Sequence, residues 1–293
     1  MKLNTLLRQF HTELDGMYGK SEVDSFFNLL IEHYLNIKRI KLILEPDFKI
    51  RPNQVEFMTR ALAELNDQIP IQYIIGETEF YGLKFKVDES VLIPRPETEE
   101  LVEATLKLLE SEESQPEKKS ILDIGTGSGC IAISLAYFSP KTKVYALDVS
   151  EAALKTARKN AAINDAQVSY FKADILKPDT WNQYLKSLKL DVIISNPPYV
   201  RQSEKLEMKP NVLNNEPSLA LFVEDENPLV YYKAICDCAQ LILNDGGHLI
   251  MEINEFLGAE LIQLMNDNGF MEIVLKKDIY GKDRIIQGKK MTK

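Results

Sequence analysis

Hydrophobic residues in the first quarter of the chain recur every three to four positions. Leu3, Leu6, Leu7, Phe10 and Leu14 follow this spacing, and similar runs continue to about residue 75. A period near 3.6 places such residues on one face of a helix. The pattern therefore predicts a small bundle of helices over residues 1–76.

The ends of these helices are predicted from glycine, serine and proline. Gly16 and Gly19 are expected to end the first helix, and Ser21 is expected to cap a second one. A third, short helix is expected over residues 37–44. Pro52 suits the first turn of a fourth helix, because proline has no N–H to leave unpaired there.

A different pattern begins at residue 77. Residues 77–92 alternate apolar and polar side chains around Gly82, which predicts a β-hairpin that links two domains. A helix is then expected to open at Glu97 or Thr98. Residues 111–119 are polar and predict a surface loop.

Strand and helix patterns alternate from residue 119 onward. The expected strands cover residues 120–124, 143–147, 168–172, 190–194, 248–253, 272–275 and 284–287. The expected helices cover residues 130–138, 151–163, 181–188, 228–243 and 255–268. This alternation predicts the α/β class, with a doubly wound, largely parallel sheet of seven strands and helices on both faces. We expect this domain to span residues 93–293.

Composition and charge narrow the function classes. No apolar run approaches the roughly 20 residues that span a bilayer, and the N-terminus has no apolar signal-peptide core, so a cytoplasmic protein is expected. The formal charge of −9 opposes strong non-specific binding to nucleic acid. Cys130, Cys236 and Cys238 lack a disulfide or zinc spacing, and we expect buried thiols.

A glycine-rich loop follows the first expected strand of the α/β domain. Its sequence, DIGTGSG, runs from Asp123 to Gly129 and opens the next helix. Gly125, Gly127 and Gly129 let the backbone turn tightly and lie close to a ligand, so the loop, with Thr126 and Ser128, is a candidate nucleotide site. The spacing is not the GxGxxG of dinucleotide folds, and a plain strand-to-helix turn is the alternative.

Acidic residues follow the next two strands. Asp148 stands about 20 residues after the glycines, where a carboxylate can bridge both hydroxyls of a ribose. Asp174 is placed to accept from an adenine amine, with Ile175 as an apolar cover, although a helix-capping role for Asp174 is an alternative. One ribose, one adenine and no phosphate favour S-adenosylmethionine as the ligand.

The strand over residues 190–194 runs into Asn196, Pro197, Pro198 and Tyr199. Two consecutive prolines cannot continue a sheet ladder, so the chain leaves the sheet in a stiff loop. Such a loop fixes the Asn196 carboxamide beside backbone carbonyls and an aromatic ring, which suits a planar group that carries an NH2. A simple strand-ending turn is the alternative.

The sequence resembles a known family in these motifs. DIGTGSG, Asp148, Asp174 and NPPY, in that order, resemble the class I S-adenosylmethionine-dependent methyltransferases that act on planar amines. The resemblance is closer to the peptide chain release factor glutamine methyltransferases. Residues 70–100 look like that family's inter-domain hairpin and IPRPET loop, and residues 215–221 look like its segment after NPPY.

The resemblance implies a reaction and a set of site residues. The reaction is methyl transfer from S-adenosylmethionine to the side-chain amide nitrogen of the glutamine in the GGQ motif of release factors, without a metal. Residues 1–76 would dock the substrate, with neither nucleic acid nor a membrane as a direct partner. The implied cofactor-binding residues are Gly125, Thr126, Gly127, Ser128, Gly129, Asp148, Asp174, Ile175 and Asn196. The implied substrate-binding residues are Asn196, Pro197, Pro198 and Tyr199, of which Asn196, Pro197 and Tyr199 are catalytic.

In this mechanism the Asn196 side-chain oxygen and the Pro197 carbonyl accept the two hydrogens of the substrate amide, and Tyr199 packs on its plane. Other functions stay open at this stage. An N(6)-adenine DNA methyltransferase also uses NPPY, but it predicts a basic DNA-facing surface. Glutamine methylation of a ribosomal protein is a closer alternative, and a non-catalytic adaptor would be expected to have lost some of the motifs. The roles of Arg95, Glu97 and Glu216 are open.

Overall fold

A computed structural model describes residues 1–111 and 118–292 of the chain. The chain divides into two compact units. The smaller unit holds Met1–Gly76 and Lys209–Asn215, and the larger one holds Glu77–Met208 and Glu216–Lys293. Most of the surface loop predicted over residues 111–119 lies outside the described residues.

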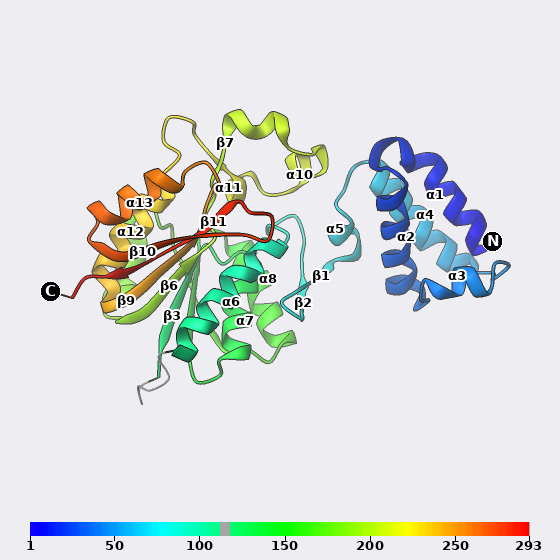
Figure 1. Cartoon of the computed structure of the whole chain (residues 1–293). Coiled ribbons are helices and arrows are strands. Elements are labelled where there is room, and N and C mark those ends of the chain that lie inside the picture. The colour runs from blue at the N-terminus through cyan, green and yellow to red at the C-terminus, as the bar shows by residue number, and fades with distance from the viewer. Residues whose placement is uncertain (112–117, 293) are drawn as a thin grey trace. The chain divides into compact units, whose positions relative to one another are not determined.

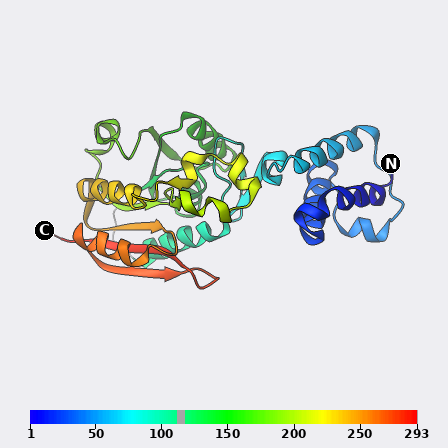
Figure 2. The ribbon, with the colours of Figure 1, turned by 90° about the horizontal axis from the view of Figure 1, so that it is seen from above.

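The smaller unit is helical. Its helices are α1 (Leu3–Tyr18), α2 (Lys20–Leu35), α3 (Ile40–Leu44), α4 (Pro52–Asn66) and α5 (Ile71–Ile75), with α10 (Pro210–Asn215) from later in the chain. Helices α1, α2 and α4 pack against one another (Figures 1 and 2). The rings of Phe10 and Phe27 meet edge to face between α1 and α2, with centroids 5.1 Å apart. The predicted helical spacing thus gives a bundle with its own core.

Three details of the predicted helix ends are wrong. Gly16 lies inside α1, which continues to Tyr18. Gly19, with φ +80°, both ends α1 and precedes the first residue of α2, so Ser21 falls inside α2 and cannot cap it. A left-handed Asn36 ends α2, and the third helix consequently starts at Ile40 and not at residue 37. Pro52 stands at the start of α4, as predicted.

The larger unit contains the predicted hairpin and the α/β domain. Its strands are β1 (Glu77–Phe80), β2 (Leu83–Lys86), β3 (Ser120–Ile124), β4 (Lys143–Asp148), β5 (Val168–Lys172), β6 (Leu190–Ser195), β7 (Val200–Arg201), β8 (Phe222–Val223), β9 (Leu243–Glu252), β10 (Phe270–Lys277) and β11 (Asp283–Lys290). Its helices are α6 (Pro96–Ser111), α7 (Cys130–Phe138), α8 (Glu151–Ile163), α9 (Pro178–Leu185), the 3-10 helix η1 (Gln202–Glu207), α11 (Ser218–Leu221), α12 (Val230–Ile242) and α13 (Gly258–Asp267).

Seven strands form one sheet in the order β10-β11-β9-β6-β3-β4-β5. The pairs from β9 to β5 are parallel, which confirms the doubly wound α/β prediction. The last strand, β11, runs antiparallel between β9 and β10. The position of β11 between β9 and β10 could not be predicted, because a hairpin can pair with the edge of a sheet through either of its strands.

Element bounds near the C-terminus differ from the prediction. Strand β9 starts at Leu243 and not at residue 248, so α12 ends at Ile242, one residue before its predicted end. Strands β10 and β11 are both longer than predicted, because they pair with each other from Phe270 opposite Lys290 to Lys277 opposite Asp283. Helix α6 opens at Pro96, one residue before Glu97.

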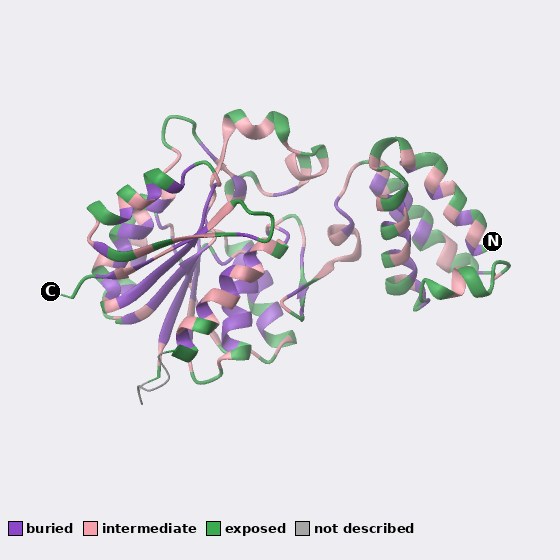
Figure 3. Ribbon diagram, in the orientation of Figure 1, coloured by how far each residue is buried: buried purple, intermediate pink, exposed green. Residues whose placement is uncertain are grey.

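The sheet separates two hydrophobic cores, because alternate strand residues point to opposite faces. Ile193 of β6 packs with α9, α12 and α13, whereas Val192 and Ile194 pack with α6 and α7 on the other face. The central strands β3 and β6 are almost wholly buried, whereas the edge strands β5 and β10 are partly exposed, as are the outer faces of the helices (Figure 3). No helix among the described residues has the length and apolar character needed to cross a membrane.

Adjacent residues of α12 allow a direct test of this core. Ile242 is fully buried in the core that α9, α12 and α13 form with one face of the sheet, whereas Leu241 is 60% exposed. Ile242→Ala should lower the free energy of unfolding by about 2–5 kcal/mol, because it leaves a cavity. Leu241→Ala should change it by less than about 0.5 kcal/mol. Urea denaturation of the two variants measures the difference, and equal losses would contradict the assigned core.

Candidate active site

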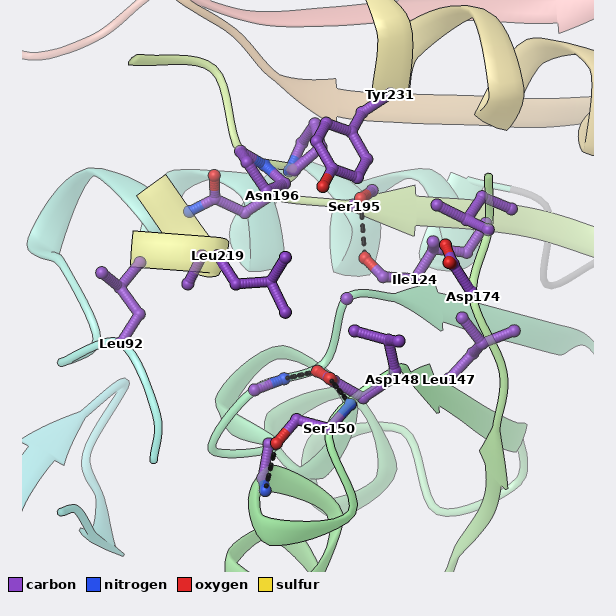
Figure 4. A pocket seen from close by; sticks show the side chains of 18 of the residues that line it. Leu92, Ile124, Leu147, Asp148, Ser150, Asp174, Ser195, Asn196, Leu219 and Tyr231 are labelled. Atoms are coloured by element: carbon purple, nitrogen blue, oxygen red, sulfur yellow. Dashed lines mark hydrogen bonds between the residues drawn. The ribbon is translucent and has the colours of Figure 1, made fainter. Parts of the chain in front are cut away.

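A cavity of about 260 Å³ lies at the carboxyl edge of the parallel strands. Its walls come from the loops after β3, β4, β5 and β6, from the loop before α6, from α11 and from the first turns of α8 and α12. Figure 4 shows Asn196 and Asp148 on opposite sides of this cavity. The cavity therefore collects residues that are separated by as many as 145 positions in the sequence, from Ser90 to Ile235.

The glycines of the loop after β3 have two different roles. Gly125 and Gly127 line the cavity with φ of +76° and +54°, and a Cβ at either position would meet no protein atom within 4 Å. At Gly129, with φ +84°, a Cβ would lie 2.7 Å from the Ile133 side chain and 3.1 Å from Ala157. Gly125 and Gly127 thus expose backbone to a ligand, and Gly129 lets α7 approach α8.

The other two loop residues lie behind the cavity wall. Thr126 is buried, and its hydroxyl donates to Asp123 Oδ2 over 2.7 Å. Ser128 is also buried, and its carbonyl accepts from the Asn160 side chain over 2.9 Å. Neither residue lines the cavity, so they support the loop from inside the protein.

Asp148, the last residue of β4, holds the glycine loop against the sheet. Its two oxygens each accept one backbone N–H, from Gly127 and from Ser150, both over 2.8 Å. Burial raises the pKa of this carboxyl, and the N–H donors work against that rise. A carboxylate has about four lone-pair positions, so two remain for donors in the cavity. These two can accept from a pair of neighbouring hydroxyls.

Asp174 and Ile175 also line the cavity, just after β5. Asp174 Oδ1 accepts from the Leu176 N–H over 3.0 Å, and Lys177 lies 3.2 Å from Oδ2. Helix α9 begins at Pro178 with Lys177 as its N-cap, so Asp174 does not cap that helix. Asp174 is left with acceptor capacity at the cavity wall.

The NPPY residues divide between the cavity and the protein interior. Asn196, Pro197 and Pro198 line the cavity, and the Ser195 hydroxyl fixes the strand end by donating to the Ile124 carbonyl over 2.7 Å (Figure 4). Tyr199 does not line it. Its ring packs against the core, and its hydroxyl donates to Glu252 over 3.1 Å.

Arg95, whose role the sequence left open, forms an ion pair with Glu216 over 2.6 Å. The Glu216 side chain is 1% exposed, and its other oxygen accepts from the Ile93 N–H over 3.2 Å. Glu216 therefore fastens the loop before α6 to the segment that leads into α11. Both segments contribute walls of the cavity, through Leu92 and Leu219 among others.

Several lining residues were not identified from the sequence. They are Ser90, Val91, Leu92, Ile124, Leu147, Val149, Ser150, Ala153, Ala173, Leu176, Ser195, Pro217, Leu219, Ala220, Tyr231 and Ile235. Those next to a motif could have been found by extending it along the chain. Tyr231 carries no such signal, because an aromatic residue in the first turn of a helix has the same pattern whether it faces a core or a cavity.

Asp123 is a buried carboxyl below the glycine loop. Its Oδ1 atom has no hydrogen-bond partner among the described residues, and its Oδ2 accepts from the Thr126 hydroxyl. Burial raises the pKa of Asp123 to about 7, and the negative charge of Asp148 adds to the rise. Folding thus shifts this side chain toward its protonated form relative to the unfolded chain.

Comparison with known proteins gives the class first. The family model of the methyltransferase small domain matches residues 98–219. Among solved structures, the catalytic domain of human Mettl16 is similar with a TM-score of 0.53 and 14% identity, covering 82% of this chain and 81% of that one. The Thermus thermophilus 16S rRNA methyltransferase RsmC is similar with a TM-score of 0.50 and 17% identity, covering 73% and 49%. These structures share the fold, so the fold of this chain is the Rossmann-like fold of methyltransferases.

The relatives give the family. The release factor glutamine methyltransferase of Flavobacterium psychrophilum is 46% identical over 98% of this chain and 99% of its own length. That of Bacteroides thetaiotaomicron is 39% identical over 97% and 99%. The family model of the PrmC N-terminal domain matches residues 5–76. The chain belongs to the release factor glutamine methyltransferases.

The pKa of Asp123 predicts a pH dependence of stability. Its folded value of about 7 lies above the unfolded value of about 4, so unfolding releases a proton between these pH values. The stabilising contribution is complete below about pH 4 and is lost as the pH rises through 7. Asp123→Asn should remove it, so urea denaturation without ligand should show wild type losing stability relative to the variant from pH 4 to 8. Parallel curves would contradict the shift.

Proposed function

We propose that the protein transfers a methyl group from S-adenosylmethionine to the side-chain amide nitrogen of the glutamine in the GGQ motif of peptide chain release factors, and so modulates translation termination. The observation that carries this proposal is the cavity between Asp148 and Asn196, in a chain whose full-length relatives bear the name release factor glutamine methyltransferase. A ligand site and a rigid amide acceptor meet in this one cavity.

The lining residues fit S-adenosylmethionine. The free lone pairs of Asp148 would accept from the two ribose hydroxyls, and Gly125 and Gly127 leave room for the ligand against bare backbone. Asp174 would accept from the adenine amine, with Ile175 as an apolar cover. Thr126, Ser128 and Gly129 would act by holding the loop in shape. When bound, S-adenosylmethionine would supply an electrophilic methyl group on a sulfonium, with S-adenosylhomocysteine as the leaving group and a proton lost from the amide nitrogen after transfer.

The residues of the NPPY motif would orient the glutamine side chain of the substrate. An amide nitrogen is a weak nucleophile, because its lone pair is delocalised into the carbonyl. The Asn196 side-chain oxygen and the Pro197 carbonyl would accept its two hydrogens and would stabilise the positive charge that develops on nitrogen. Pro198 keeps this loop stiff. Tyr199 does not line the cavity and would support this loop from the core side, where its hydroxyl donates to Glu252.

We further propose a division of labour along the chain. Residues 1–76 would be the substrate-docking domain, residues 77–92 a hairpin linker, and residues 93–293 the methyltransferase domain. The release factor would be the macromolecular partner, with no direct contact to nucleic acid or membrane, in the cytoplasm and without a metal. The net charge of −9 supports a protein substrate over DNA, because DNA binding depends on neutralising phosphates.

The reaction is tested with purified protein, labelled S-adenosylmethionine and a release factor. Label should enter the release factor and should be absent from a form in which the GGQ glutamine is replaced by alanine. Duplex DNA and ribosomal proteins serve as competing substrates in parallel reactions. Label on the alanine form, or on either competing substrate instead of the release factor, would contradict the proposal.

Two variants separate cofactor binding from chemistry. Asp148→Ala should raise the dissociation constant of S-adenosylmethionine by roughly 5- to 150-fold, as expected for about 1–3 kcal/mol of lost charged hydrogen bonds. Asn196→Ala should lower kcat by about 100-fold or more and leave that dissociation constant within a few-fold. Calorimetry and initial rates measure the two effects. Wild-type turnover by Asn196→Ala would refute its assigned role.

A further inference from the structure

A chain of buried hydrogen bonds lies directly behind Asn196. The Asn196 side-chain nitrogen donates to the Thr98 hydroxyl over 3.1 Å, and that hydroxyl donates to Glu252 Oε2 over 2.7 Å. Thr98 stands in the first turn of α6, and Glu252 is the last residue of β9. Both are nearly inaccessible, with exposed fractions of 2% and 1%. Water therefore cannot replace either partner without a change in packing.

The direction of these bonds decides which way the Asn196 carboxamide faces. The Thr98 hydroxyl has a single hydrogen, and it donates this hydrogen to Glu252 Oε2. Thr98 can then only accept from Asn196, which requires the NH2 end of the carboxamide to point at it. The Asn196 oxygen is consequently turned away from Thr98 and is free to accept a hydrogen in the cavity.

The same carboxylate also holds the aromatic residue of the motif. Glu252 Oε1 accepts from the Tyr199 hydroxyl over 3.1 Å, so its two oxygens serve two residues of the NPPY loop. Burial raises the pKa of Glu252, and the Thr98 and Tyr199 donors and the nearby positive Arg284 work against that rise. Arg284 is itself held by Asp278 over 3.1 Å. One buried acid at the end of β9 thus ties the loop to α6.

The orientation of the carboxamide matters because its two ends have opposite hydrogen-bonding character. A substrate amide presents an NH2 group, which needs an acceptor. A flipped Asn196 would present its own NH2 to the substrate NH2, and the two donors would repel. A structure that fixes the correct orientation before the substrate arrives removes this unproductive state.

We propose that Thr98 and Glu252 are positioning residues that lock the Asn196 carboxamide with its oxygen toward the substrate nitrogen. This inference rests on the proposed function, since it concerns the same amide acceptor. Neither residue lines the cavity, so both act through Asn196 and Tyr199 and have no contact with the ligand. The effect of losing them falls on the rate of methyl transfer, while the cofactor site between Asp148 and Asp174 is preserved.

The test compares Thr98→Val, Thr98→Ser and the matched control Thr105→Val. Thr105 is a fully buried threonine two turns further along α6 whose hydroxyl bonds only to the Leu101 carbonyl, so its substitution removes a similar hydroxyl outside the network. Thr98→Val should lower kcat about 10- to 100-fold, with the S-adenosylmethionine dissociation constant within threefold of wild type. Thr98→Ser should restore most of the rate, and Thr105→Val should match wild type.

A second variant tests the direction of the bonds. Glu252→Gln keeps the size of the side chain, but its NH2 group can donate to Thr98 and turn the hydroxyl hydrogen toward Asn196. We expect a partial loss of kcat, again with unchanged cofactor affinity. Thermal melting curves of all four variants identify any variant that fails to fold. If Thr98→Val fails to fold, Glu252→Gln and Thr98→Ser still test the positioning role.

The outcomes separate this inference from the function on which it rests. Wild-type protein that transfers no label to a release factor would overturn the proposed function. Wild-type activity together with a Thr98→Val kcat within about threefold of wild type, or equal losses in Thr98→Val and Thr98→Ser, would overturn the positioning role alone. An unchanged kcat in Glu252→Gln would show that Glu252 has no positioning role.

Discussion

The parallel pairing of β3 with β4 and β6 is the constraint on which the site depends. In this register Ile124 lies opposite Leu147 on one side and Ser195 on the other. The next residue of each strand is therefore at the same edge, and these residues are Gly125, Asp148 and Asn196. Neighbouring strands are about 4.8 Å apart, so the three are brought together without any long side chain. Two short bonds hold this edge, from the Gly125 N–H to the Leu147 carbonyl and from Ser195 to Ile124.

Buried polar groups under this edge give it rigidity. Asp148 lies between two backbone donors, and Glu252 lies between two hydroxyl donors. A buried carboxylate that loses its donors is costly, so each pair of bonds resists displacement of the loop it holds. Asp123 is the exception, because one of its oxygens is buried without a partner. Burial raises its pKa to about 7.

Particular residues show how far the sequence could predict this arrangement. The glycine loop, Asp148, Asp174, Ile175 and the first three NPPY residues are at or beside the predicted edge, because strand ends and prolines leave a local signature. The three glycines of the loop have different roles in the structure, although nothing in the sequence separates them. Gly125 and Gly127 face the cavity, and Gly129 faces α8, a distinction that depends on where Ala157 lies. The partner of Arg95 was likewise missed, since Glu216 is 121 positions away.

The sequence by itself determined the α/β class, the helical N-terminal part, the order of strands along the chain and the motifs, because these follow from hydrophobic period and from the backbone limits of glycine and proline. Only the tertiary structure decided the position of β11 within the sheet, the packing of Tyr199 against the core and the contact of Thr98 with both Asn196 and Glu252. Those features arise between segments that are 53 to 154 positions apart. No local pattern of residues encodes which of them meet, since packing across the whole sheet selects the partners.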